Sequence, residues 1–152
     1  IVQHLEYLQM VEEGLDRRVY ELQTTYVRPL SHRARLQIGA KGTLERKSEG
    51  VRSDVDSDAF KASLGLNYLL KKDLAALLKY DYGNRRYLDA NALLKKKRQD
   101  RTHTLSARLV YQTAPSGSFQ LEVGHEWQRS NLTPYTYDKL TAQLSYIHRF
   151  DF

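Results

Sequence analysis

Hydrophobic side chains occupy alternate positions along much of this chain, and polar side chains fill the positions between them. The last alternating stretch has Thr141, Gln143, Ser145, Arg149 and Asp151 between the apolar residues Leu140, Ala142, Leu144, Tyr146, Phe150 and Phe152. A period of two places successive side chains on opposite faces of a β-strand. The alternation recurs over residues 19–28, 34–45, 60–70, 74–83, 104–113 and 119–128. The sequence therefore predicts an all-β fold with about seven clear strands, each having one apolar and one polar face.

The predicted strands are joined by short and long connections in alternation. Short turns are expected at 29–32, 70–73 and 115–118, and long polar links at 46–58, 84–103 and 129–138. Short turns at one end and long links at the other are typical of outer-membrane barrels. A soluble β-sandwich, the alternative fold, has no reason to separate its connections in this way.

Residues 1–12 alternate poorly. Leu5, Leu8, Val11 and Leu15 would fit an amphipathic helix equally well. A strand is favoured because it makes the strand number even, as in bacterial single-chain barrels. It also lets an exported chain begin at the short-turn end. With a helix here, the chain is expected to be the end of a larger barrel. In either case residues 1–152 are predicted to form one domain.

Phe152 is an aromatic residue at the C-terminal end of an alternating strand. This arrangement resembles the closing strand of Gram-negative outer-membrane β-barrel proteins. The resemblance implies an antiparallel up-and-down transmembrane β-barrel of about eight strands, as in small barrels of the OmpA type, located in the bacterial outer membrane. It also implies that Phe152, Phe150 and Tyr146 form the signal that the barrel-assembly machinery reads.

Three short segments near the C-terminus carry a second resemblance. Residues 129–131, 137–139 and 144–146 are similar to the final hairpin of larger bacterial barrels. Those barrels include exopolysaccharide-export porins and surface-lipoprotein assembly barrels. This similarity implies that the chain could be the C-terminal part of a larger porin or export channel.

Aromatic residues of the apolar face lie near the strand ends, and aliphatic residues lie in the middle. Those toward the short turns are Tyr26, Tyr68, Tyr111, Phe119, Phe150 and Phe152, and those toward the long links are Tyr20, Phe60, Tyr82 and Trp127. Two aromatic girdles around an aliphatic band match the two interfaces of a membrane. A soluble core would place its largest side chains in mid-strand.

Charges of both signs share the polar face. They are Arg35, Lys41, Lys61, Lys79, Arg108 and Arg149 with Glu21, Glu45, Asp81, Glu122 and Glu126. Confined charges are costly unless they are paired, and an ion-selective pore needs a surplus of one sign. About eight strands leave an interior just wide enough for side chains. A packed, cross-linked lumen is therefore expected.

The net charge of +6 comes largely from the predicted links. The clearest basic cluster is Arg85, Arg86, Lys95, Lys96, Lys97, Arg98 and Arg101. Lys and Arg bind lipopolysaccharide phosphates well, so we expect these residues to contact outer-membrane lipids, lipopolysaccharide or a protein partner. A merely solvated loop is the alternative. Nucleic acid is disfavoured because the aromatic residues needed for base stacking lie on the opposite face.

Signals of catalysis are weak. The chain has no Cys, no phosphate-binding or dinucleotide glycine motif, and only dispersed histidines, so no cofactor or metal is expected. His125 and Ser130 suggest the pair of a lipid A-modifying enzyme, but a separation of five places them on opposite faces of a strand. The sequence therefore favours a non-enzymatic structural, anchoring or surface-interaction protein. A transport role within a larger barrel is the alternative, and a lipid A-modifying enzyme is less favoured.

Overall fold

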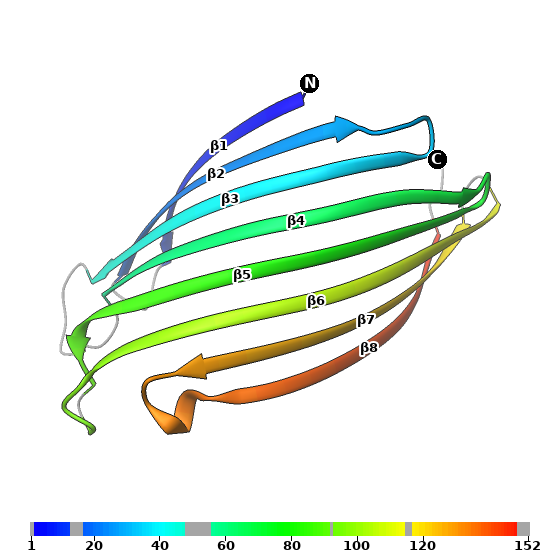
Figure 1. Ribbon diagram of the computed structural model, residues 1–152. Coiled ribbons are helices and arrows are strands. Elements are labelled where there is room, and N and C mark those ends of the chain that lie inside the picture. The colour runs from blue at the N-terminus through cyan, green and yellow to red at the C-terminus, as the bar shows by residue number, and fades with distance from the viewer. Residues whose placement is uncertain (1, 13–16, 48–55, 92, 115–116, 149–152) are drawn as a thin grey trace.

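The computed structural model describes residues 2–12, 17–47, 56–91, 93–114 and 117–148, with only the backbone described for 2–12, 17 and 114. These residues form one antiparallel sheet whose eight strands follow the order of the chain (Figure 1). The strands are β1 (Val2–Glu12), β2 (Arg17–Pro29), β3 (Ala34–Lys47), β4 (Ser57–Lys71), β5 (Leu74–Ala90), β6 (Lys97–Ala114), β7 (Gly117–Ser130) and β8 (Tyr137–His148). A short 3-10 helix, η1 (Thr133–Tyr135), precedes β8. The expected all-β, up-and-down antiparallel arrangement is confirmed.

Residues 2–12, for which strand and helix were both open, form a strand. β1 is antiparallel to β2, in a register that runs without interruption from Val2 opposite Val27 to Glu12 opposite Arg17. The interpretation of this segment as a strand is therefore confirmed. No helix in the described part of the chain has the length and apolarity to cross a membrane.

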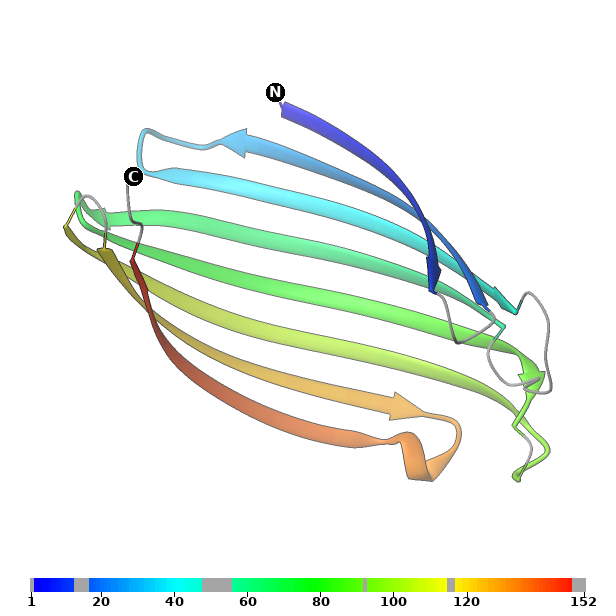
Figure 2. The ribbon, with the colours of Figure 1, turned by 180° about the vertical axis from the view of Figure 1, so that it is seen from behind.

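The sheet is strongly curved and has two free edges. Seen from behind, the edge strands β1 and β8 bend toward the viewer, so the sheet forms an open trough (Figure 2). Among the described residues β1 pairs only with β2, and β8 only with β7. Closure into a barrel is not found, and each edge leaves backbone N–H and C=O groups without a neighbouring strand.

The connection between β5 and β6 differs from the expected long link. Residues 84–103 were expected to be a loop, but β5 continues to Ala90 and β6 begins at Lys97. These are the two longest strands, with 17 and 18 residues. The turn between them is closed by Asn91, whose Oδ1 accepts the backbone N–H groups of Leu93 and Leu94, and by Lys95 in the left-handed region at φ 51°.

Turns at the other end of the sheet are short, as expected. β2 and β3 are joined by a tight turn in which the Ser31 hydroxyl oxygen accepts the N–H groups of Arg33 and Ala34, at 3.2 and 3.0 Å. A serine hydroxyl that binds nearby backbone in this way favours a turn, and the N–H of Leu69 on β4 adds a hydrogen bond to Arg33 O at 2.8 Å. Only two residues separate β4 from β5.

Candidate functional site

Polar side chains of this sheet are buried, and large apolar side chains are exposed. Among the described residues the buried polar ones are Glu45, Ser57, Asp81, Asp100 and Gln128, whereas Leu132 is the only buried hydrophobic residue. A curved sheet crowds the side chains of its inner side and spreads those of its outer side. The polar face is therefore the concave face, and the apolar face is the convex face.

The convex face carries a continuous apolar band across β2–β8. It runs from Phe60 to Tyr68 on β4 and from Phe119 to Trp127 on β7, close to the ~9–11 residues with which a tilted strand crosses a bilayer. Leucines in the middle of the band are widely exposed, with Leu64 at 50% and Leu78 at 51%. Such a surface is unusual for a protein in water, because soluble monomers rarely expose apolar patches above a few hundred Å².

Aromatic rings lie in contact at both margins of this band. Near the long-hairpin end, His103 stacks on Trp127 with ring centroids 5.4 Å apart, and Tyr82 lies 5.2 Å from His103. Near the short-turn end, Phe119 and Tyr146 lie 4.8 Å apart. The expected grouping of aromatics at strand ends is thus found on adjacent strands β5–β8.

Ion pairs connect charged side chains on the concave face, within one strand or between strands. The pairs are Glu21 with Lys41 at 2.8 Å, Asp81 with Lys61 at 3.6 Å and with Lys79 at 3.1 Å, Glu45 with Arg85 at 3.7 Å, and Arg108 with Glu122 at 2.6 Å. Glu126 accepts hydrogen bonds from Thr104 and Tyr137. The expected charge pairing of the polar face is confirmed for these residues. Arg149 lies outside the described residues.

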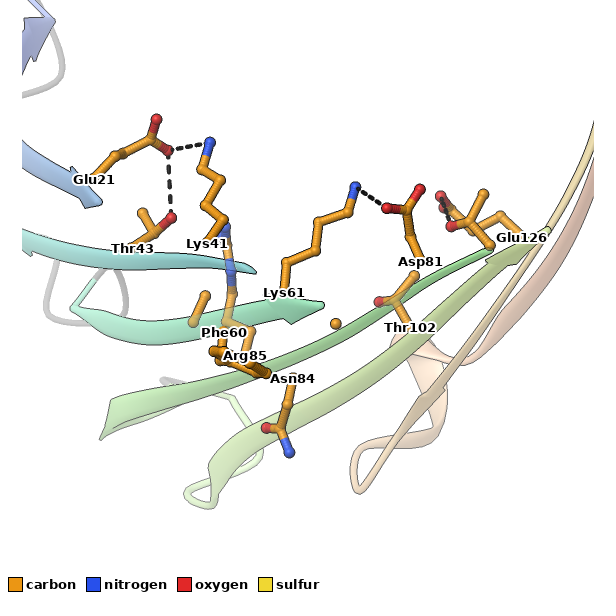
Figure 3. Close-up of a pocket in the computed structure, with 13 residues that line it drawn as sticks. Glu21, Lys41, Thr43, Phe60, Lys61, Asp81, Asn84, Arg85, Thr102 and Glu126 are labelled. Carbon is orange, nitrogen blue, oxygen red and sulfur yellow. Dashed lines mark hydrogen bonds and ion pairs between the residues drawn. The ribbon is translucent and has the colours of Figure 1, made fainter. Parts of the chain in front are cut away.

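The concave face is not completely filled. A hollow of about 290 Å³ lies over β2–β7 and is lined mainly by charged and hydroxyl side chains, including Glu21, Lys41, Lys61, Asp81, Thr102 and Glu126 (Figure 3). A second hollow of about 220 Å³ shares Lys41, Lys61 and Asp81 with the first. In the first hollow three cations, Lys41, Lys61 and Arg85, face three carboxylates, Glu21, Asp81 and Glu126, so that space has no surplus of either sign with which to select an ion. The second hollow has Lys41, Lys61 and Lys79 against Asp81, and is therefore cationic.

Arg98 organises the far end of the concave face. Its guanidinium lies 3.5 Å from the ring centre of Tyr135 and 4.7 Å from that of Tyr87. It also pairs with Asp100 at 2.6 Å. Burial lowers the pKa of Arg98, but the hydrogen bond to Asp100 and the nearby phenols outweigh it, so the pKa is raised above its ordinary value. Planar stacking with a paired carboxylate is a typical use of arginine, and here it ties the β7–β8 connection to the long hairpin.

The basic residues predicted to form one loop cluster are divided between two faces and a turn. Arg85 and Arg98 lie on the concave face and are paired with Glu45 and Asp100. Register places Arg86 and Arg101 on the convex face, and Lys95 and Lys96 lie in the turn. The placement in one loop was therefore wrong. A lipid- or partner-binding role for these residues stays a prediction.

Other predicted site residues are partly outside the described structure. Phe150 and Phe152 of the proposed assembly signal lie outside the described residues. Tyr146, the third residue of that signal, is 53% exposed on the convex face of β8. His125 faces Leu105, and Ser130 faces Asp100, so the two lie on opposite faces of β7. Over the described ranges no group of three or more metal-ligating side chains is found.

Sequence reasoning missed Tyr87, Asp100 and Tyr135, the residues around Arg98, because they fall in segments interpreted as links. It also missed that Arg101 and Arg129 are direct cross-strand neighbours, which depends on register. Comparison with known proteins gives no match: no family model, no curated protein and no solved structure is similar to this chain.

Proposed function

We propose that this chain forms the wall of a β-barrel in the bacterial outer membrane, with a structural, anchoring or surface-contact role. The observation that supports the proposal best is the inverted polarity of the sheet. Leu64 and Leu78 are half exposed on the convex face, while Glu45 and Asp81 are each only 6% exposed on the concave face. Acyl chains provide the surroundings that such a convex face requires, and a closed barrel provides those of the concave face.

Closure would pair β1 with β8. Both are free edges, and unpaired backbone groups cost several kcal/mol each in a hydrocarbon environment. Joining them would remove both edges, and eight strands make one of the narrowest barrels, with an interior about wide enough for side chains. The ion pairs on the concave face would then line that interior.

Closure can be tested by cysteine cross-linking, since the natural chain has no Cys. Tyr7→Cys on β1 is combined in turn with Leu140→Cys, Ala142→Cys or Leu144→Cys on β8. We expect one pairing to form an intramolecular disulfide after folding into phosphatidylcholine vesicles. Tyr7→Cys with Ile38→Cys on the interior strand β3 is the control, and it should not cross-link. Failure of every β1–β8 pairing would refute closure of this chain on itself.

Transport as part of a larger barrel is the second candidate. The free edges of β1 and β8 favour it, because each can accept a further strand. A narrow barrel with paired interior charges should show no steady conductance in planar bilayers, whereas a larger barrel should show stable open-channel steps. Disulfide-linked dimers in the cross-linking experiment would also support the larger assembly.

Surface contact is proposed for the long β5–β6 hairpin, which carries Arg86, Lys95, Lys96 and Lys97. These cations would attract lipopolysaccharide or another anionic partner. Phe152 is proposed to act as the signal for the barrel-assembly machinery. Deleting Phe152 should lower the amount of folded protein in the outer membrane while leaving spontaneous folding into vesicles unchanged, because only assembly in the cell needs the signal.

A further inference from the structure

Two arginines face each other on the convex side of the sheet. Arg101 of β6 and Arg129 of β7 are direct partners in the antiparallel register. Like charges in directly opposed positions destabilise a strand pair. Arg129 is partly neutralised, with Nη1 3.5 Å from an oxygen of Asp138. For Arg101 no ion pair is found within the described residues. The positive charge of Arg101 and Arg129 is therefore only partly neutralised by the described side chains around them.

A hollow of about 260 Å³ lies at this pair. Its walls are Gln99, Arg101, Arg129, Ser130 and Asn131. The wall is held by three hydrogen bonds of Asn131: its N–H donates to Gln99 O at 3.1 Å, its Oδ1 accepts the Gln99 N–H at 2.8 Å, and its Nδ2 donates to Lys97 O at 2.8 Å. Part of the wall is thus backbone that is already fixed by hydrogen bonds, and both arginines line the hollow.

The hollow lies directly beside the aromatic margin of the apolar band. Tyr82, His103 and Trp127 form one row across β5–β7, and Asn84, Arg101 and Arg129 form the next row. Aromatic rings of membrane proteins gather at the level of the lipid headgroups. On the proposed function, the arginine row is therefore at the level of lipid phosphates, one step farther from the hydrocarbon.

We propose that Arg101 and Arg129 bind the phosphate of an anionic lipid headgroup between them. A phosphate shared by two guanidinium groups accepts paired N–H donors from each and converts their repulsion into attraction. A phosphate monoester fits best, because it carries about −1.5 to −2 charges at neutral pH. The inference rests on the proposed membrane location. It assigns the anion to Arg101 and Arg129. It excludes Arg85 and Arg98, which are already paired with carboxylates on the concave face.

The test uses Trp127, the only Trp of the sequence, as a reporter next to the site. The protein is folded into phosphatidylcholine vesicles that contain phosphatidic acid with brominated chains, and quenching of Trp127 fluorescence is compared with that by brominated phosphatidylcholine. We expect phosphatidic acid to be enriched near Trp127. Arg101→Gln and Arg129→Gln should each reduce that enrichment about fivefold, as expected for about 1 kcal/mol per basic side chain at a membrane surface.

The matched control is Arg28→Gln with Arg33→Gln, which removes the same charge at the opposite end of the strands. Equal loss in the control and in Arg101→Gln with Arg129→Gln would overturn the site, because only net charge would then matter. Inorganic phosphate that abolishes the enrichment, where chloride at equal ionic strength does not, would assign the site to free phosphate and overturn the lipid headgroup. Absence of quenching by brominated phosphatidylcholine itself would instead refute membrane insertion, and with it the proposed function.

Discussion

Replacing Leu64 by Arg tests whether the convex face contacts lipid. Leu64 is 50% exposed and lies in mid-band on β4, between Ile38 and Tyr80 in register, with Phe60 and Tyr68 toward the two margins. Arg at the middle of a bilayer costs about 2–4 kcal/mol on the lipid face of a barrel. This corresponds to a decrease of roughly 30- to 1,000-fold in the folding equilibrium constant.

The control places the same Leu→Arg substitution on the same face, but beyond the aromatic margin and not in the middle of the band. Leu88 is 36% exposed near the end of β5, beyond the aromatic margin marked by Tyr82. There Leu88→Arg should cost only about 0–1 kcal/mol. The measurement is reversible urea unfolding in phosphatidylcholine vesicles, followed by Trp127 fluorescence and far-UV circular dichroism.

The difference in the free energy of unfolding between Leu64→Arg and Leu88→Arg tests whether the convex face contacts lipid. If water or a covering protein contacted the convex face, the free-energy cost of each substitution would depend on its local packing. It would not depend on its position between the two aromatic margins. Equal free energies of unfolding for Leu64→Arg and Leu88→Arg would therefore refute the lipid contact. So would a wild-type protein that stays monomeric and folded in buffer without detergent.

Three further predictions concern the concave face. Asp81→Asn should lower the free energy of unfolding by about 1.5–3 kcal/mol, because Lys61 and Lys79 lose their shared carboxylate; adding Lys79→Met should recover part of that loss in the same urea assay. Arg98→Lys should keep the charge but lose the planar stacking on Tyr87 and Tyr135, and hydrogen exchange should become faster over residues 131–136 than in the Lys97→Arg control. The hydrogen bond to Glu126 raises the pKa of Tyr137 to about 12. The contribution of this hydrogen bond to the free energy of unfolding is therefore complete below pH 10 and is lost as the pH rises toward 12. Absorbance at 295 nm should show one tyrosinate fewer near pH 11 than in Glu126→Gln, and equal titration curves would contradict the contact.

Strand positions could be predicted wherever the two faces differ in polarity. Leu64, Leu66 and Tyr68 alternate with polar or small residues, so β4 was recognised from its sequence. The signal ends where a strand is polar on both faces. Between Asn84 and Ala90 the outward and inward positions both carry charges, as Arg86 and Arg85 show. The sequence there resembles a loop, although the backbone continues to pair.

Contacts that depend on register could not be predicted. Arg101 and Arg129 are far apart in sequence, and a shift of two residues between β6 and β7 would separate them. The same holds for Arg98 and Tyr135, which meet because η1 folds back over the long hairpin. By contrast, charge pairing on the polar face followed from composition alone, because a balanced set of confined charges has to pair whatever the register.

Alternation by itself does not say which face is the inside of a protein. A sandwich and a barrel have the same period of two, and they differ only in whether the apolar or the polar side faces inward. The curvature of the sheet resolves this ambiguity. The carboxylate of Asp81 is already enclosed by its own sheet, with Lys61 and Lys79 within ion-pair distance. Leu140 on β8 is 75% exposed and Leu144 72%, so the convex face is the one that lacks a partner. A covering layer therefore has to be apolar and has to lie outside the trough, and the bilayer that we propose for this role would also account for the aromatic margins.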